Sequence, residues 1–156
     1  GMPGTGKSLI GKLLAELTGK TLQDTDAKIE EEAKMTIPEI FEKEGESGFR
    51  DRESAICKKL GKERNLIIAT GGGAILRPES VDALRQNGTL VHITRSIDKL
   101  PTRGRPLSKN IETLKKMEAQ RIPLYKAAAD ITFRNNYTCS RKKLRQRVNT
   151  YILEKL

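Results

Sequence analysis

Residues 1–8 read Gly-Met-Pro-Gly-Thr-Gly-Lys-Ser and match the phosphate-loop pattern G-x-x-x-x-G-K-[ST] at every fixed position. In such a loop, glycines let successive backbone N–H groups turn into one concavity, where a polyphosphate binds at the start of the next helix. Lys7 can then reach the β- and γ-phosphates, and the Ser8 hydroxyl can bind Mg²⁺. We expect the nucleotide to be contacted by Gly4, Thr5, Gly6, Lys7, Ser8 and Leu9.

The residues after the loop fit a helix with one apolar face and with Gly19 as its stop signal. The alternative is a glycine-rich turn that only caps this helix and leaves Lys7 in solvent. A phosphate loop normally follows a buried strand. We therefore expect a further apolar strand before Gly1, at the centre of the sheet.

Length and composition favour one domain over residues 1–156, with 36% hydrophobic residues and no run apolar enough to span a membrane. Cys57 and Cys139 are too few for a disulfide framework, which fits a cytoplasmic protein with reduced cysteines. The formal charge of +10 attracts anions. The basic run at residues 141–147 is either the solvated face of a helix or an RNA-binding surface; without aromatic stacking platforms, we expect no nucleic-acid partner.

Short extended segments alternate with helical patterns along the chain. This order predicts an α/β fold in which helices cover both faces of a parallel sheet, with ligands at the carboxyl ends of the strands. Strands are expected at Thr21–Gln23, Leu66–Ala69, Thr89–Thr94 and Ile131–Phe133. Helices are expected at residues 38–43 and 49–62, from Pro78, from Ile111 with a kink or break at Pro123, and from Ser140.

Two features follow strands and can bind a ligand there. Asp24 and Asp26 point to the same side of an extended chain, so that one carboxylate can serve a metal and the other a substrate. The alternative is that Asp24 or Asp26 caps the next helix. Gly71, Gly72 and Gly73 let a ligand approach the backbone closely, or else form a flexible turn.

Four basic or titratable residues need an interpretation. Arg50 opposes the dipole of a helix that begins nearby, so we expect an acidic partner or an anionic ligand beside it. Arg103 and Arg105 lie in a Gly/Pro-punctuated segment at about residues 101–110, which is typical of a phosphate-clamping lid. His92 is the only histidine, and we interpret it as a structural residue of its strand.

Taken in order, these motifs resemble the shikimate kinase family over nearly the full length of the chain. The motifs are the phosphate loop, Asp24-x-Asp26, Phe49-Arg50 with Glu53, the triple glycine, Arg105-Pro106-Leu107 and Arg121-x-Pro123-Leu124-Tyr125. The resemblance implies a three-layer α/β/α P-loop NTPase fold like that of nucleoside monophosphate kinases, with a five-stranded parallel sheet. It also implies the transfer of phosphate from ATP to the 3-hydroxyl of shikimate, in aromatic amino-acid biosynthesis.

The same resemblance implies a role for each motif. Lys7, Asp26 and Arg105 would be catalytic, with Arg105 also binding ATP, and Ser8 and a water on Asp24 would hold Mg²⁺. Substrate-binding helices would span about residues 26–62. The shikimate site would be formed by Asp26, Arg50, Arg121, Gly71, Gly72 and Gly73, with an apolar wall at Ile37, Phe41 and Phe49. Arg103 and residues 134–136 are candidates for contacts with adenine.

Two alternatives remain open at this point. One is another P-loop small-molecule kinase, such as a gluconate kinase-like enzyme, which does not need two arginines for a substrate carboxylate. The other is a non-catalytic module that binds nucleotides or nucleic acid, as the charge of +10 allows. We expect a monomer whose partners are ATP and shikimate, with no membrane partner. Arg50 and Arg121 also have a simpler interpretation as surface ion-pair residues.

Overall fold

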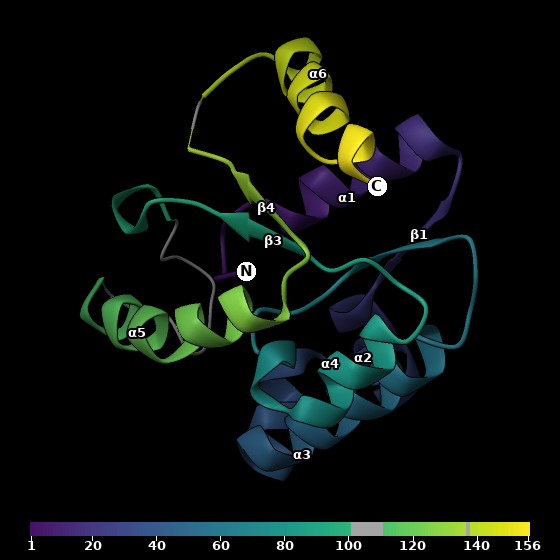
Figure 1. Ribbon diagram of the computed structural model, residues 1–156. Helices are drawn as coiled ribbons and strands as arrows, with labels where there is room; N and C mark the ends of the chain where they lie inside the picture. Colours follow the sequence, from purple (N-terminus) through teal and green to yellow (C-terminus); the bar gives the residue numbers. More distant parts are fainter. Residues whose placement is uncertain (101–110, 137) are drawn as a thin grey trace.

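A computed structural model describes residues 1–100, 111–136 and 138–156 (Figure 1). The expected lid, including Arg103 and Arg105, lies outside the described residues. None of the helices in the described ranges is long and apolar enough to cross a membrane.

Helices and strands alternate through most of the described chain, as the sequence predicts. The helices are α1 (Lys7–Thr18), α2 (Thr25–Ala33), α3 (Ile37–Leu60), α4 (Pro78–Arg85), α5 (Ile111–Ala128) and α6 (Arg141–Tyr151), with short 3-10 turns at Ala74–Leu76, Ile97–Lys99 and Leu153–Lys155. The strands are β1 (Thr21–Asp24), β2 (Leu66–Ala69), β3 (Val91–Thr94) and β4 (Ile131–Arg134).

The strands form two parallel pairs. β1 pairs with β2, in a register that places Asp24 beside Ala69, and β3 pairs with β4, with Thr94 beside Arg134. Within the described residues, no strand joins the two pairs. The parallel α/β architecture is therefore confirmed, and the fifth, central strand stays a prediction.

A cavity of about 580 Å³ separates the two pairs. Its lining includes Ile67 on β2 and Ile93 on β3, together with Ile10 and Leu14 on α1. Gly1 also lines the cavity and packs against β3, because a β-carbon on Gly1 would lie only 2.1 Å from the carbonyl oxygen of Ile93. The phosphate loop therefore begins where this cavity meets β3.

Alternate residues of β2 pack into different cores, which is how a strand serves two layers of helices. Ile67 packs against the cluster built on α1 and α6, whereas Leu66 and Ile68 pack against the cluster built on α2 and α3. Helices therefore cover both faces of the strands, as expected for a three-layer fold.

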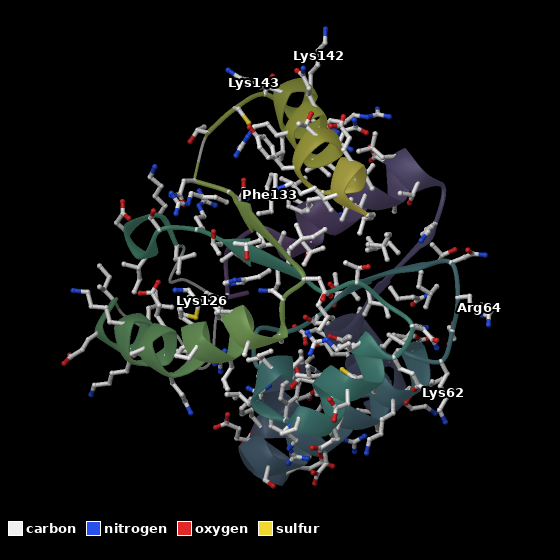
Figure 2. The ribbon with its side chains drawn as sticks, in the orientation of Figure 1. Lys62, Arg64, Lys126, Phe133, Lys142 and Lys143 are labelled. Carbon is white, nitrogen blue, oxygen red and sulfur yellow. The ribbon has the colours of Figure 1, made fainter. Side chains whose placement is uncertain are left out.

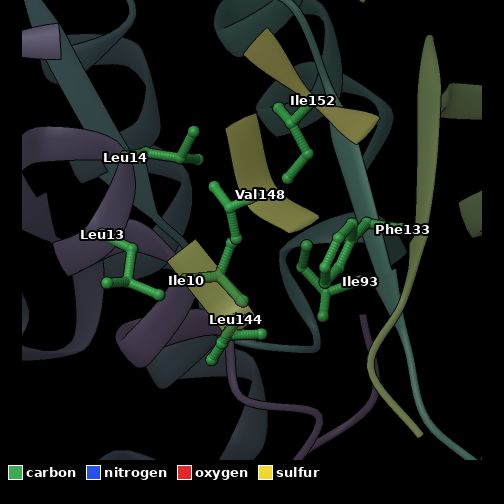
Figure 3. Close-up of a cluster of buried hydrophobic side chains, with 8 residues drawn as sticks. All are labelled: Ile10, Leu13, Leu14, Ile93, Phe133, Leu144, Val148 and Ile152. Atoms are coloured by element: carbon green, nitrogen blue, oxygen red, sulfur yellow. The ribbon is translucent and has the colours of Figure 1, made fainter. Parts of the chain in front are cut away.

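The largest cluster joins α1 and α6 to β3 and β4 (Figure 3). Its buried members are Ile10, Leu13, Leu14, Ile93, Phe133, Leu144, Val148 and Ile152. Burying each large aliphatic side chain contributes about 1.5–3 kcal/mol. This cluster fixes the helix that follows the phosphate loop against the second strand pair.

The separation of two helices at Gly45 is confirmed, whereas a break at Pro123 is wrong. Element α3 consists of two helices across a kink at Gly45, whose φ 70° and ψ −176° are not helical but are accessible to glycine. Gly45 therefore ends the first helix, as predicted, and the second helix begins earlier than Phe49, because residues 46–60 are helical. Helix α5 continues through Pro123. Pro123 lies on the exposed side while Arg121 and Tyr125 are buried, so packing of the inner face holds the helix together.

Candidate active site

The phosphate loop has the backbone that its glycines predict. Gly4 has φ 82° and Gly6 has φ 95°, and Gly6 caps the start of α1. The Lys7 ammonium folds back over the loop and donates to the carbonyl oxygens of Gly1 and Met2, at 2.9 Å each. Thr5 is fully buried and donates to Met2. The loop and the start of α1 therefore form the concavity expected for a polyphosphate.

Ser8 and Asp24 meet at the edge of this concavity. The Ser8 hydroxyl lies 3.5 Å from Oδ2 of Asp24. Oδ1 of Asp24 accepts from the backbone N–H groups of Asp26 and Ala27, so Asp24 caps α2. The capping interpretation of Asp24 is confirmed, and its second oxygen still faces Ser8.

Asp26 lies in the first turn of α2, beside the glycine loop, residues 71–73. Its Oδ1 atom is buried and has no hydrogen-bond partner among the described residues. Burial, followed by the nearby carboxylates of Asp24 and Glu53, raises the pKa of Asp26 to about 6, although Lys7 and Arg50 act in the opposite direction. The carboxyl group therefore changes its charge near neutral pH.

Arg50 has the acidic partner that its position on α3 predicts. Its guanidinium donates to Oε1 of Glu53 at 2.7 Å, and both side chains are buried. A second carboxylate, Glu46, lies 3.5 Å away at the exposed edge. Burial raises the pKa of Glu53, and Arg50 opposes that shift. The Arg50 Nε atom has no partner in the described part of the chain.

The glycine loop is where the separate motifs meet. A β-carbon on Gly71 would lie 2.9 Å from Oδ1 of Asp26, and one on Gly73 would lie 2.2 Å from the Arg50 guanidinium. A β-carbon on Gly72 would lie 2.9 Å from the Gly1 carbonyl oxygen and 3.4 Å from Nη1 of Arg121. Only glycines allow these groups to approach so closely.

Arg121 reaches the loop from α5 and is 4% exposed. Its Nε atom has no partner among the described residues. The simpler interpretation of Arg50 and Arg121 as surface ion-pair residues is wrong, because both are buried and both lie against the glycine loop.

The aromatic residues of the expected apolar wall pack together. The rings of Phe41 and Phe49 have centroids 4.9 Å apart, and the Arg50 guanidinium lies 5.1 Å from the centroid of Phe49. Phe49 belongs to the α2–α3 core cluster, against which Ile37 and Phe41 also pack. Phe49 therefore supports Arg50 directly, and contact of these side chains with a substrate stays a prediction.

The candidates for adenine contacts have other partners. Asn135 donates to the carbonyl oxygen of Thr5 at 2.8 Å, and Asn136 pairs with Ser96. The carbonyl oxygen of Arg134 accepts from Arg147. Asn135 thus ties the end of β4 to the phosphate loop, and contacts of this segment with adenine remain a prediction.

Sequence reasoning gave no role to two residues at the loop. Thr25 is buried, and its hydroxyl accepts from the N–H of Gly71 at 3.1 Å. Tyr125 donates its hydroxyl proton to the carbonyl oxygen of Gly72. The available signals were weak: Thr25 lies between the two aspartates, and Tyr125 lies one helical turn after Arg121.

A phosphate loop at the end of a parallel strand pair, facing a buried carboxylate and two buried guanidiniums, defines a P-loop kinase of small molecules. Comparisons with known proteins narrow this class. A family model for shikimate kinase matches residues 3–156.

Individual relatives agree with the family model. A shikimate kinase of Nitrosomonas europaea is 44% identical over 139 residues, which are 84% of this chain and 66% of the relative. One of Chromobacterium violaceum is 39% identical, over 84% of this chain and 76% of the relative. Among solved structures, shikimate kinase from Acinetobacter baumannii in complex with shikimate has a TM-score of 0.90 and 35% identity, and covers 99% of this chain and 90% of its own. The chain belongs to the shikimate kinase family.

Proposed function

We propose that the protein transfers the γ-phosphoryl group of ATP to the 3-hydroxyl of shikimate, giving shikimate 3-phosphate and ADP. The observation that carries this proposal is the meeting of Asp26, Arg50, Arg121 and the phosphate loop at Gly71–Gly73. A carboxylated acceptor and a triphosphate would share that small space.

The two arginines fit the carboxylate of the acceptor. Guanidinium groups bind a planar carboxylate through parallel N–H bonds, and buried ones do so with little competition from water. Oε1 of Glu53 already accepts a hydrogen bond from Nη1 of Arg50 at 2.7 Å, which fixes the arginine side chain. Other N–H groups of Arg50, such as that at Nε, remain for a ligand. Arg121 supplies the second guanidinium from α5.

Asp26 fits the acceptor hydroxyl. Its unpartnered Oδ1 atom can accept the hydroxyl hydrogen bond and, as the new bond to phosphorus forms and the bond to the ADP oxygen breaks, take the proton. A pKa of about 6 leaves Asp26 ionised, and so able to accept that proton, above this pH.

Ser8 and Asp24 fit a magnesium site. Mg²⁺ is usually held by one or two protein oxygens with water and substrate phosphates, rather than by a full protein cage. The Ser8 hydroxyl would bind the ion directly and Oδ2 of Asp24, 3.5 Å from that hydroxyl, would bind it through a water. No cluster of three acidic, histidine or cysteine ligands occurs in the described ranges. Mg²⁺ bound there would offset charge on the β- and γ-phosphates.

Arg105 completes the proposed set. It lies outside the described residues, so its role rests on the resemblance of Arg105-Pro106-Leu107 to the family motif. We propose that it stabilises charge on the transferring phosphoryl group.

A nucleic-acid partner is the less favoured reading of the charge of +10. Lys142 and Lys143 project from α6 at the top of the view, whereas Lys62 and Arg64 lie at its right, in the segment after α3 (Figure 2). These labelled charges belong to separate elements, whereas a nucleic-acid footprint is a basic patch clustered on one face or along one helix. Filter binding to RNA should therefore be weak and should disappear as salt is raised.

A coupled assay of ADP release tests the proposal directly. With ATP and Mg²⁺, we expect turnover on shikimate and none above background on gluconate or nucleoside monophosphates. Turnover on gluconate without turnover on shikimate would instead support the gluconate kinase-like alternative. RNA binding that survives high salt, without any kinase activity, would support a non-catalytic module.

A further inference from the structure

Tyr125 connects α5 to the glycine loop. Its hydroxyl donates to the carbonyl oxygen of Gly72 at 2.5 Å, and the side chain is 5% exposed. Burial raises the pKa of Tyr125, so the hydroxyl stays protonated and continues to donate at neutral pH. Arg121 lies one turn earlier on the same helix and is also buried. One helix therefore presents both a guanidinium and a hydroxyl to the loop.

His92 fixes the other side of the Tyr125 ring. The two rings stack with centroids 4.8 Å apart and an interplanar angle of 27°. Burial lowers the pKa of His92 to about 4, so this ring is neutral at physiological pH and packs as an uncharged surface. Because β3 carries His92, the tyrosine ring is held between the sheet and the loop, and the direction of its hydroxyl is set by packing.

The hydrogen bond from Tyr125 fixes the peptide between Gly72 and Gly73. A trans peptide directs its C=O and N–H to opposite sides, so fixing the carbonyl of Gly72 also fixes the N–H of Gly73 on the side away from Tyr125. The Thr25 hydroxyl holds the neighbouring N–H of Gly71 at 3.1 Å. Glycines otherwise have wide conformational freedom, so these two hydroxyls select one arrangement of the loop.

We propose that Tyr125 is a positioning residue for the acceptor substrate: by holding the 72–73 peptide, it sets the distance between the glycine-loop amides and the Arg121 guanidinium. The inference rests on the proposed function, since it assigns Tyr125 to the shikimate half of the site. Tyr125 acts through the loop and through Arg121.

Tyr125→Phe tests the role of the hydroxyl, because the ring remains to stack on His92. We expect the KM for shikimate to rise about tenfold, the size expected for one lost hydrogen bond, with kcat and the KM for ATP within about threefold of wild type. Amide hydrogen exchange at residues 71–76 should become faster, since the loop loses an anchor.

Ser80→Ala is the matched control. The Ser54 and Ser80 hydroxyls share a buried hydrogen bond of 2.8 Å between α3 and α4, so the control also removes one buried hydroxyl contact, at a position that the site does not use. Ser80→Ala should lower the melting temperature about as much as Tyr125→Phe does, since each removes one buried hydroxyl. It should leave both KM values and the hydrogen exchange at residues 71–76 unchanged.

Two results would overturn the inference. One is a normal KM for shikimate in Tyr125→Phe; the other is an equal rise in both KM values, which would indicate general destabilisation. If wild-type protein does not phosphorylate shikimate, the proposed function fails. The exchange measurement still decides the anchoring role in that case, because unchanged exchange at residues 71–76 refutes it without any assay of activity.

Discussion

In the proposed nucleotide half of the site, the Lys7 ammonium lies against carbonyl oxygens of its own loop, at 2.9 Å from Gly1 and from Met2. In the proposed acceptor half, Arg50 and Glu53 of α3 form a buried ion pair, and Arg121 comes from α5. All three side chains are buried and lie against the glycine loop. The first half is a local structure, and the second is assembled by the fold. Loss of one group in the acceptor half should therefore disturb its neighbours, because buried charges depend on their partners.

Asp26→Asn should have the largest effect. It keeps the shape of the side chain and removes the proton acceptor, so kcat should fall by about 10²–10⁴-fold, the usual contribution of a general base. The KM for ATP should stay within about twofold, because the phosphate loop is a separate, local structure. Steady-state kinetics of both substrates measure this, and near-normal turnover would refute the role of Asp26.

Arg121→Ala should affect the acceptor half selectively. It removes a charged hydrogen-bond donor to the substrate carboxylate, so the KM for shikimate should rise by about 10–100-fold while that for ATP changes little. Arg121→Lys is the matched control, because it keeps the charge and loses the planar fork, and its effect should be intermediate. Equal losses for both substrates would mean that the variant damages the fold.

The difference between the halves explains what the sequence could predict. The phosphate loop was predictable because eight contiguous residues determine its backbone, with Gly4 and Gly6 at positive φ. The acidic partner of Arg50 was also predictable, since Glu53 lies three residues later on the same helix. The convergence of the acceptor residues could be predicted only from the order of the motifs, together with the rule that ligands bind at the carboxyl ends of parallel strands.

Other features could not be read from the sequence. The contact from Tyr125 to Gly72 joins residues 53 positions apart, and no local pattern encodes it. The unbroken course of α5 through Pro123 depends on the burial of its inner face, which outweighs the local preference of proline to break a helix. The raised pKa of Asp26 follows chiefly from its depth of burial, which the spacing of Asp24 and Asp26 does not reveal.

The pKa of Asp26 gives a smaller, graded test. Because that pKa is about 6, kcat/KM for shikimate should fall as pH drops below this value and level off above it. Stability should follow the opposite direction: the folded pKa exceeds the ordinary 3.8, so the contribution of this group is full below 3.8 and is lost as pH rises through about 6. Both trends should disappear in Asp26→Asn, followed by pH–rate profiles and thermal melts. A rate profile that is the same in both proteins would assign the inflection to another group.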